Sequence, residues 1–164
     1  MSALVDPDEV DGDIYDEIHN LEQLQSALSG ALLNNDISHE QFNDEMFKTR
    51  YYLDVLTKTL IHKFGKPENY LCPSFDPTNN NFNPSKYWRG PIWINLNWMM
   101  YQGFKRYGYD QLAKRIKNDS IELVKKNGFY EYFDPRKTEL EKRAYGGDNF
   151  SWTAALILDF ILEK

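Results

Sequence analysis

The sequence predicts an all-α fold of about five helices that pair as antiparallel hairpins. Apolar residues recur at helical spacing in five stretches, and turn-forming residues separate each stretch from the next. The five stretches are 14–32, 38–61, 91–104, 110–124 and 151–162. The elaborate loops fall at one end of the predicted hairpins and the short ones at the other, which is the pattern expected of a helical toroid.

The first two predicted helices have recognisable ends. The polar run 34–36 ends the first helix, and Ser38 with Gln41 forms a capping-box pattern that begins the second. Tyr51, Tyr52 and Val55 widen the apolar stripe of the second helix. We therefore expect that helix to be well buried.

Residues 66–89 are predicted to form an ordered loop. The stretch holds four prolines and three successive asparagines, and it shows no helical or strand period. A loop of this length in a compact domain is usually either functional or disordered. Its five aromatic residues argue against disorder; they are Tyr70, Phe75, Phe82, Tyr87 and Trp88. We expect this loop to fold over a site.

Three more helices are expected in the C-terminal part of the chain. Pro91 suits the first position of one helix, where a missing N–H costs nothing, and Gly108 ends that helix. Asp110 caps the next helix, which Gly128 ends. Ser151 caps the last helix, which is apolar nearly all round and is therefore expected to be buried.

Charge is unevenly distributed along the 164 residues. Residues 1–47 contain 12 acidic and no basic residues, whereas the remainder contains 13 acidic and 19 basic residues. We interpret residues 1–12 as an acidic, flexible arm and residues 13–164 as one domain. The scattered basic residues and the net charge of −6 disfavour nucleic-acid binding.

The sequence offers no support for a metal, a nucleotide cofactor or a membrane span. Cys72 is the only cysteine, and the three histidines are far apart and fit no metal-binding spacing. Gly146-Gly147 lacks the lysine and hydroxyl residue of a phosphate-binding loop. The start of the chain does not resemble a signal peptide, and no apolar run approaches the ~20 residues of a membrane span. We expect a cytoplasmic chain without cofactors or metal.

The stretch 87–98 concentrates side chains that suit a sugar-binding site. Tryptophan and tyrosine rings can stack on the C–H faces of sugars, while arginine and asparagine can bond to hydroxyl groups. We expect Trp98 to pack in the core, and Trp88 and Trp93 to line a pocket at the loop-facing start of the helix. Core packing is the alternative for aromatic residues at helical spacing, but the aromatic loop that precedes them favours the pocket.

Glu131 is the carboxylate that we expect to act on a substrate. It lies in the short strand-like segment Gly128–Pro135, which is rich in aromatic residues. A carboxylate that is partly removed from water is a better base near neutral pH. The alternative is that Glu131 forms an ion pair with Arg89 or Arg143, or simply points outward.

Four motifs in this order resemble the C-terminal catalytic half of glycoside hydrolase family 63. They are Tyr87–Asn95, Arg106–Tyr109, Gly128–Pro135 and Phe150–Leu156. The resemblance implies an (α/α)6 toroid, of which this chain carries a part, and inverting hydrolysis of an α-glucosidic or α-mannosidic bond. The carbohydrate substrate would be an α-glucoside or an α-mannoside.

The resemblance also implies roles for individual residues. Glu131 matches the family's general base, which activates water. The residues expected to bind sugar are Tyr87, Trp88, Arg89, Gly90, Trp93 and Trp152. The run Asp11–Asp16 does not resemble the motif of the family's general acid, so activity would need an acid from a partner chain or from a missing N-terminal half. The exposed faces of an incomplete toroid favour a homo-oligomer, and the alternative function is a truncated, inactive protein that binds sugar or another protein.

Overall fold

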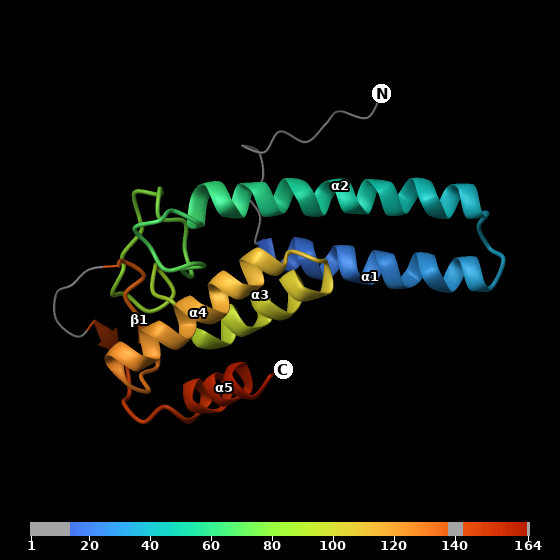
Figure 1. Cartoon of the computed structure of the whole chain (residues 1–164). Coiled ribbons are helices and arrows are strands. Elements are labelled where there is room, and N and C mark those ends of the chain that lie inside the picture. Colours follow the sequence, from blue (N-terminus) through green and yellow to red (C-terminus); the bar gives the residue numbers. More distant parts are fainter. Residues whose placement is uncertain (1–13, 138–142, 164) are drawn as a thin grey trace. The chain divides into compact units, whose positions relative to one another are not determined.

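The computed structural model of the chain describes residues 14–137 and 143–163 (Figure 1). The predicted arm, residues 1–12, lies outside the described residues. The elements in order are α1 (Ile14–Leu33), α2 (His39–Phe64), α3 (Ile94–Arg106), α4 (Asp110–Asn127), β1 (Tyr132–Phe133), β2 (Ala144–Tyr145) and α5 (Ser151–Leu162). The all-α class and the number of helices are therefore confirmed in the described part of the chain.

The chain divides into two compact units, with the boundary between Ile61 and His62. This boundary lies within α2, one turn before the helix ends. That residues 13–164 form one domain stays a prediction.

The first unit contains α1 and most of α2, joined by a short turn. Asn35 adopts a positive φ of 60° in this turn, which asparagine tolerates better than most residues. The predicted capping box then begins α2. The N–H of Gln41 donates to Ser38 Oγ at 3.2 Å, and the N–H of Ser38 donates to Gln41 Oε1 at 2.9 Å.

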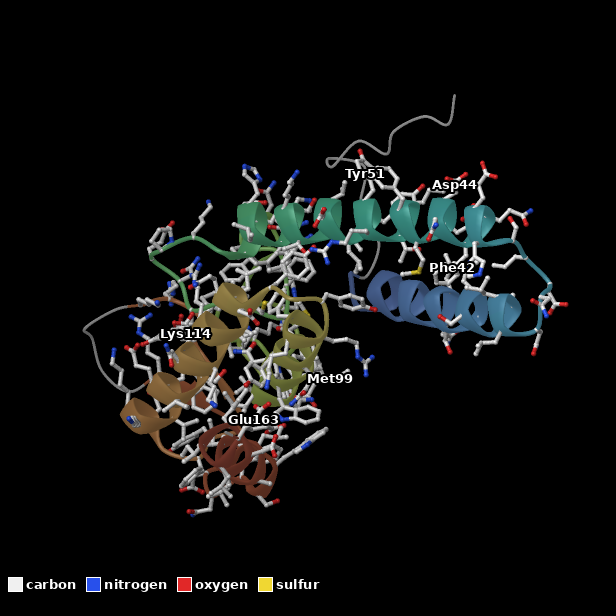
Figure 2. All side chains as sticks on the ribbon, turned by 45° about the vertical axis from the view of Figure 1, so that its right-hand side comes forward. Phe42, Asp44, Tyr51, Met99, Lys114 and Glu163 are labelled. Atoms are coloured by element: carbon white, nitrogen blue, oxygen red, sulfur yellow. The ribbon has the colours of Figure 1, made fainter. Side chains whose placement is uncertain are left out.

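Only one stripe of α2 is buried. Leu53, Leu56 and Leu60 recur at helical spacing and are buried, whereas Tyr51 and Tyr52 are 36% and 40% exposed. Figure 2 shows Tyr51 pointing away from α1. Of the three residues expected to widen the buried stripe, Val55 is buried, at 8% exposure, and the two tyrosines are not. Tyr51 lies on the opposite side of the helix from the leucines, and Tyr52 lies at the edge of their stripe.

The second unit packs α3, α4 and α5 against one another (Figure 1). α3 is buried along one wide face, since Ile94, Asn97, Met100 and Tyr101 recur at helical spacing and are all at most 5% exposed. The Tyr101 ring meets the Phe160 ring of α5 edge-on at 5.2 Å, which joins the two helices.

Two boundary and burial predictions for this unit were wrong. α3 begins at Ile94 instead of Pro91, because Ile92 is held in a bridge to Phe133 and cannot also enter the helix. α5 is not buried all round: Leu158 and Ile161 are both 58% exposed. The helix buries only the stripe that packs on α3 and α4, since no other described helix of this unit covers its remaining sides.

The connection between α2 and α3 is an ordered loop, as predicted. The side-chain oxygens of Asp76, Asn79 and Asn83 each accept a hydrogen bond from the backbone N–H two residues further on, at 2.8, 2.8 and 3.1 Å. Such Asx turns fix a loop without regular secondary structure. Arg115 of α4 anchors the beginning of the loop by donating to the carbonyl oxygen of Gly65 at 2.6 Å.

Candidate functional site

Three extended segments of the second unit lie side by side and bring distant residues together. Ile92 and Phe133 exchange both backbone hydrogen bonds, at 2.8 and 2.9 Å. Phe133 in turn pairs with Ala144, and Tyr132 pairs with Tyr145, in the antiparallel β1–β2 sheet. The residues that flank these pairs are therefore neighbours in space although they come from separate parts of the sequence.

Five aromatic rings gather on these segments, and we call them the aromatic cluster: Tyr87, Trp88, Trp93, Tyr132 and Tyr145. Trp88 stacks on Trp93 with 4.1 Å between centroids and only 4° between the ring planes. Trp93 stacks on Tyr132 at 5.1 Å, and Tyr132 stacks on Tyr145 at 5.9 Å. The Tyr87 ring meets Trp88, Trp93 and Tyr132 edge-on.

The aromatic cluster has a buried base and an open end. Trp93 is only 3% exposed, and its Nε1–H donates to the carbonyl oxygen of Tyr87 at 3.2 Å. Trp88 is 42% exposed. Because Trp93 covers one face of the Trp88 ring, any exposed part of that ring belongs to its other face and its edges. The structure thus brings Trp88 and Trp93 together, with a ring surface that a ligand can reach.

Tyr87 lies next to Trp88 at the exposed end of the aromatic cluster, and its backbone is strained. Its φ is +33°, a value that residues with a side chain rarely adopt, and the residue is 51% exposed. Backbone strain of this kind costs about 1–3 kcal/mol and persists only where the surrounding structure enforces it. Here the hydrogen bond from Trp93 and the three edge-on ring contacts enforce it.

Glu131 directly precedes Tyr132 of the aromatic cluster and is half-buried. Its side chain folds over Gly146, so closely that a Cβ added there would lie 2.3 Å from Glu131 Oε2. In the part of the chain that the structure describes, Glu131 forms no ion pair. Among the described residues, no cation competes with water or a ligand for its carboxylate oxygens.

The two arginines considered as partners of Glu131 bond elsewhere. Arg89 Nη2 donates to the carbonyl oxygen of Asn81 at 3.1 Å. Arg143 Nη1 donates to Asp134 Oδ2, also at 3.1 Å. The alternative in which Glu131 pairs with one of these arginines is not what the structure shows.

Asp134 is a buried carboxylate that the sequence pattern presented only as the end of a strand. Its side chain is 1% exposed, and it accepts hydrogen bonds from Arg136 at 2.9 and 2.7 Å and from Arg143 at 3.1 Å. Burial by itself would raise the pKa of Asp134, but the hydrogen bonds from the two guanidinium groups outweigh it and hold the pKa below its usual value. Asp134 stays ionised and paired, so it cannot act as a general acid.

The remaining predicted sugar-binding residues occupy different positions. Gly90 is buried, and a Cβ added there would lie 2.4 Å from the carbonyl oxygen of Asn83. Its lack of a side chain therefore lets the loop close on itself, and its role toward sugar stays a prediction. Arg89 is exposed beside Trp88 in the sequence. Trp152 is 54% exposed in the first turn of α5, and among the described rings it contacts none of the aromatic cluster.

Residues 14–137 and 143–163 contain neither a metal-binding cluster nor a membrane-spanning helix. No three His, Cys, Asp or Glu side chains gather in these ranges in a way that would hold a metal ion. No helix there has both the length and the apolar character that crossing a bilayer requires.

Comparison with known proteins places the chain in a family. Residues 48–153 match the model of a family described as the mannosylglycerate hydrolase MGH1-like glycoside hydrolase domain. The chain belongs to this family. The match includes the whole of the loop, α3 and α4. It also includes the aromatic cluster and Glu131, so the candidate site lies inside the MGH1-like domain.

Relatives of the MGH1-like domain are glycoside hydrolases by name. This chain is 49% identical over 96 residues to a mannosylglycerate hydrolase of Thermus thermophilus, and the match covers 58% of this chain and 22% of that protein. It is 34% identical over 91 residues to a glucosylglycerate hydrolase of Mycolicibacterium hassiacum, covering 56% of this chain and 20% of that protein.

A solved structure confirms the fold of the domain. A family 63 mannosylglycerate hydrolase of Thermus thermophilus in complex with glucose aligns with a TM-score of 0.59 and 42% identity, over 67% of this chain and 27% of that one. The predicted fold class, part of an (α/α)6 toroid, and the resemblance to family 63 are confirmed. The chain spans about a quarter of the length of this structure.

Proposed function

We propose that the MGH1-like domain carries the sugar platform and the general base of an inverting glycoside hydrolase. The aromatic cluster would bind the sugar, Glu131 would activate water, and the substrates would be α-mannosides or α-glucosides of glycerate. The observation that carries this proposal is the position of Glu131, next to Tyr132 of the aromatic cluster and without an ion-pair partner among the described residues.

The chemistry of each part follows from its surroundings. The exposed face of Trp88 offers a flat apolar surface to the C–H face of a pyranose, and Trp93 and Tyr132 support that surface from behind. Because no described cation pairs with the Glu131 carboxylate, its lone pairs can take a proton from water as the water attacks the anomeric carbon. Attack from the side opposite the leaving group inverts the configuration of that carbon.

The other half of the reaction needs a general acid that protonates the leaving oxygen. Asp134 is excluded, because two arginines hold it ionised. Asp119 is also paired within the fold, since it accepts hydrogen bonds from the N–H of Leu71 at 2.9 Å and from Lys137 at 3.1 Å. We propose that the acid comes from a longer form of the protein or from a partner chain.

Glycosyl fluorides test the base without the acid, because fluoride leaves without being protonated. We expect the purified chain to release fluoride from α-mannosyl or α-glucosyl fluoride, and NMR to show the β-sugar as the first product. Glu131→Gln should lower the rate by about 100-fold or more, the usual contribution of a positioned general base.

Glu68→Gln is the matched control for this substitution. Glu68 is also in the second unit, and its side chain is exposed. Its removal should leave the rate within about two-fold. Equal rates in Glu131→Gln and the unaltered chain would show that Glu131 is not the base, and an α-sugar as first product would exclude inversion.

A second candidate function is sugar binding without turnover. The chain covers only 22% and 20% of the two hydrolases above. This favours sugar binding without turnover, because the parts of those proteins that the chain does not cover are long enough to carry catalytic groups. Calorimetric titration with mannose and glucose decides between the two functions. Binding without any fluoride release would support the binding function, and fluoride release that depends on Glu131 would rule it out.

A further inference from the structure

We infer that Gly146 is a positioning residue for the carboxylate of Glu131. A residue without a side chain is required at position 146 for Glu131 to lie where the structure has it. This inference rests on the proposed function of Glu131 as general base, and the experiment below separates the failure of one from the failure of the other.

The register of the β1–β2 sheet places the two residues opposite each other. Tyr132 pairs with Tyr145 and Phe133 pairs with Ala144, so the next pair outward is Glu131 with Gly146. Cβ atoms of directly opposed residues usually lie about 4.5–5.5 Å apart. A Cβ added at Gly146 would lie only 2.6 Å from Glu131 Cβ, 3.1 Å from Cδ and 2.3 Å from Oε2. Glu131 therefore fills the space of the missing side chain from its first carbon to its carboxylate.

The backbone at position 146 also requires glycine. Its φ of +77° lies in the left-handed region, which residues with a Cβ enter only at a cost. This conformation turns the chain immediately after β2, where the main chain of Gly146 comes up against the Glu131 side chain.

The backbone around Glu131 has little freedom to move away from an added methyl group. On one side, Thr153 Oγ1 of α5 donates to the carbonyl oxygen of Tyr130 at 2.8 Å. The N–H of Phe150 donates to the carbonyl oxygen of Phe129, also at 2.8 Å. On the other side, Tyr132 is held in the sheet. Rotation of the Glu131 side chain can relieve the contact with Oε2, whereas the contact with Glu131 Cβ requires a shift of the backbone at position 131 or 146. Either change displaces the carboxylate.

The displacement can be sized from the contact distances. Ordinary van der Waals contact begins at 3.4 Å, and the added Cβ would lie 2.3 Å from Oε2. The oxygen would have to move by about 1 Å, and misplacement of a catalytic group by that distance can cost about 100-fold in rate. A general base must remain within hydrogen-bond reach of its water.

Kinetics of Gly146→Ala in the full chain test the inference, with α-mannosyl or α-glucosyl fluoride as substrate. We expect kcat to fall 10-fold to 100-fold and KM to change much less, because the added methyl group meets Glu131 directly and reaches the aromatic cluster only through the backbone next to Tyr132 and Tyr145. A defect that only loosened the fold would change KM to a similar extent as kcat.

The chain offers two matched controls. Gly147→Ala adds the same methyl group one residue further on, where no atom lies within 4 Å. Gly108 has the same φ of +77°, and no atom lies within 4 Å of a Cβ added there. Gly108→Ala therefore introduces the same backbone strain as Gly146→Ala without a close contact. Both should keep kcat within two-fold. If Gly146→Ala matches Gly108→Ala, the contact with Glu131 has no consequence and the inference is wrong.

Two further results complete the test. If Glu131→Gln leaves kcat unchanged, the proposed function fails; if Glu131→Gln loses activity and Gly146→Ala does not, only the inference fails. Should Gly146→Ala be too unstable to assay, its effect on Tm is measured again in the Glu131→Gly background, which removes all three close contacts. The drop in Tm should then shrink to that of Gly108→Ala, and an undiminished drop would overturn the inference.

Discussion

Replacing Gly90 by alanine should prevent the loop before α3 from closing. The added Cβ would lie 2.4 Å from the carbonyl oxygen of Asn83, 2.7 Å from its carbonyl carbon and 2.9 Å from Phe82 Cε2. Two of these three atoms are backbone, so no change of side-chain rotamer relieves the overlap. The φ of Gly90, +155°, is also one that residues with a Cβ rarely adopt.

The free energy of unfolding should fall by about 2–4 kcal/mol. Moving the Asn83 backbone breaks the hydrogen bond from its N–H to the carbonyl oxygen of Arg89, which is 2.6 Å long. A hydrogen bond of this kind contributes about 1 kcal/mol net, and strained backbone costs about 1–3 kcal/mol more. In a domain of roughly 100 residues, 1 kcal/mol corresponds to about 4 °C or more, so Tm should fall by on the order of 10 °C.

Urea unfolding followed by circular dichroism measures this loss. Gly103→Ala is the control, because Gly103 lies inside α3 with no atom within 4 Å of an added Cβ. Alanine there should raise the free energy of unfolding by about 0.5–1 kcal/mol through its better helix propensity. A Gly90→Ala variant within about 0.5 kcal/mol of the unaltered chain would refute the reasoning, since that is the ordinary effect of a surface substitution.

Two further predictions concern the segments around Glu131. The pKa of Asp134 is lower in the folded chain than in the unfolded one, so this carboxylate stabilises the fold above its unfolded pKa of about 4, and the stabilisation is lost as the pH falls through the folded value. Asp134→Asn should therefore make the decline of stability below about pH 5 less steep in urea unfolding at a series of pH values, and an unchanged slope would contradict the prediction. Thr153→Val keeps the side-chain volume but removes the hydrogen bond to the carbonyl oxygen of Tyr130, so the free energy of unfolding should fall by about 1–3 kcal/mol. A loss well below that range, measured in the same way, would mean that this hydrogen bond does not hold α5 to the segment.

The sequence predicted several parts of the fold whose signals are local, although Asp110 and Ser151 are the first residues of α4 and α5 and do not cap them, since the N-caps are Tyr109 and Phe150. The capping box of Ser38 and Gln41 and the positive-φ glycine after each of α3 and α4 involve residues only a few positions apart. The beginning of α3 could not be predicted in this way. Pro91 suits a helix, but the pairing of Ile92 with Phe133 holds the chain extended there. The exposure of one side of α5 could not be predicted either, because the apolar composition of a helix does not specify how many other helices pack around it.

The candidate site was predictable residue by residue but not as an arrangement. The stretch that contains Trp88 and Trp93 identified the start of the aromatic cluster. Tyr132 and Tyr145 join it only through the pairing of β1 with β2, which no local pattern specifies. The ion pair of Asp134 with Arg136 is an exception among the residues that were missed. An aspartate that follows an apolar strand and precedes an arginine by two residues is a signal that could have been used.

The bridge between Ile92 and Phe133 also bears on the order in which the second unit folds. It joins segments that are far apart along the chain, as do the hydrogen bonds from Arg115 to Gly65 and from Trp98 to Asp159. Contacts of this kind form only after a long stretch of chain has lost its freedom, whereas helices and Asx turns need only neighbouring residues. We therefore expect the helices to form first, and the aromatic cluster to assemble and Glu131 to be positioned late in folding.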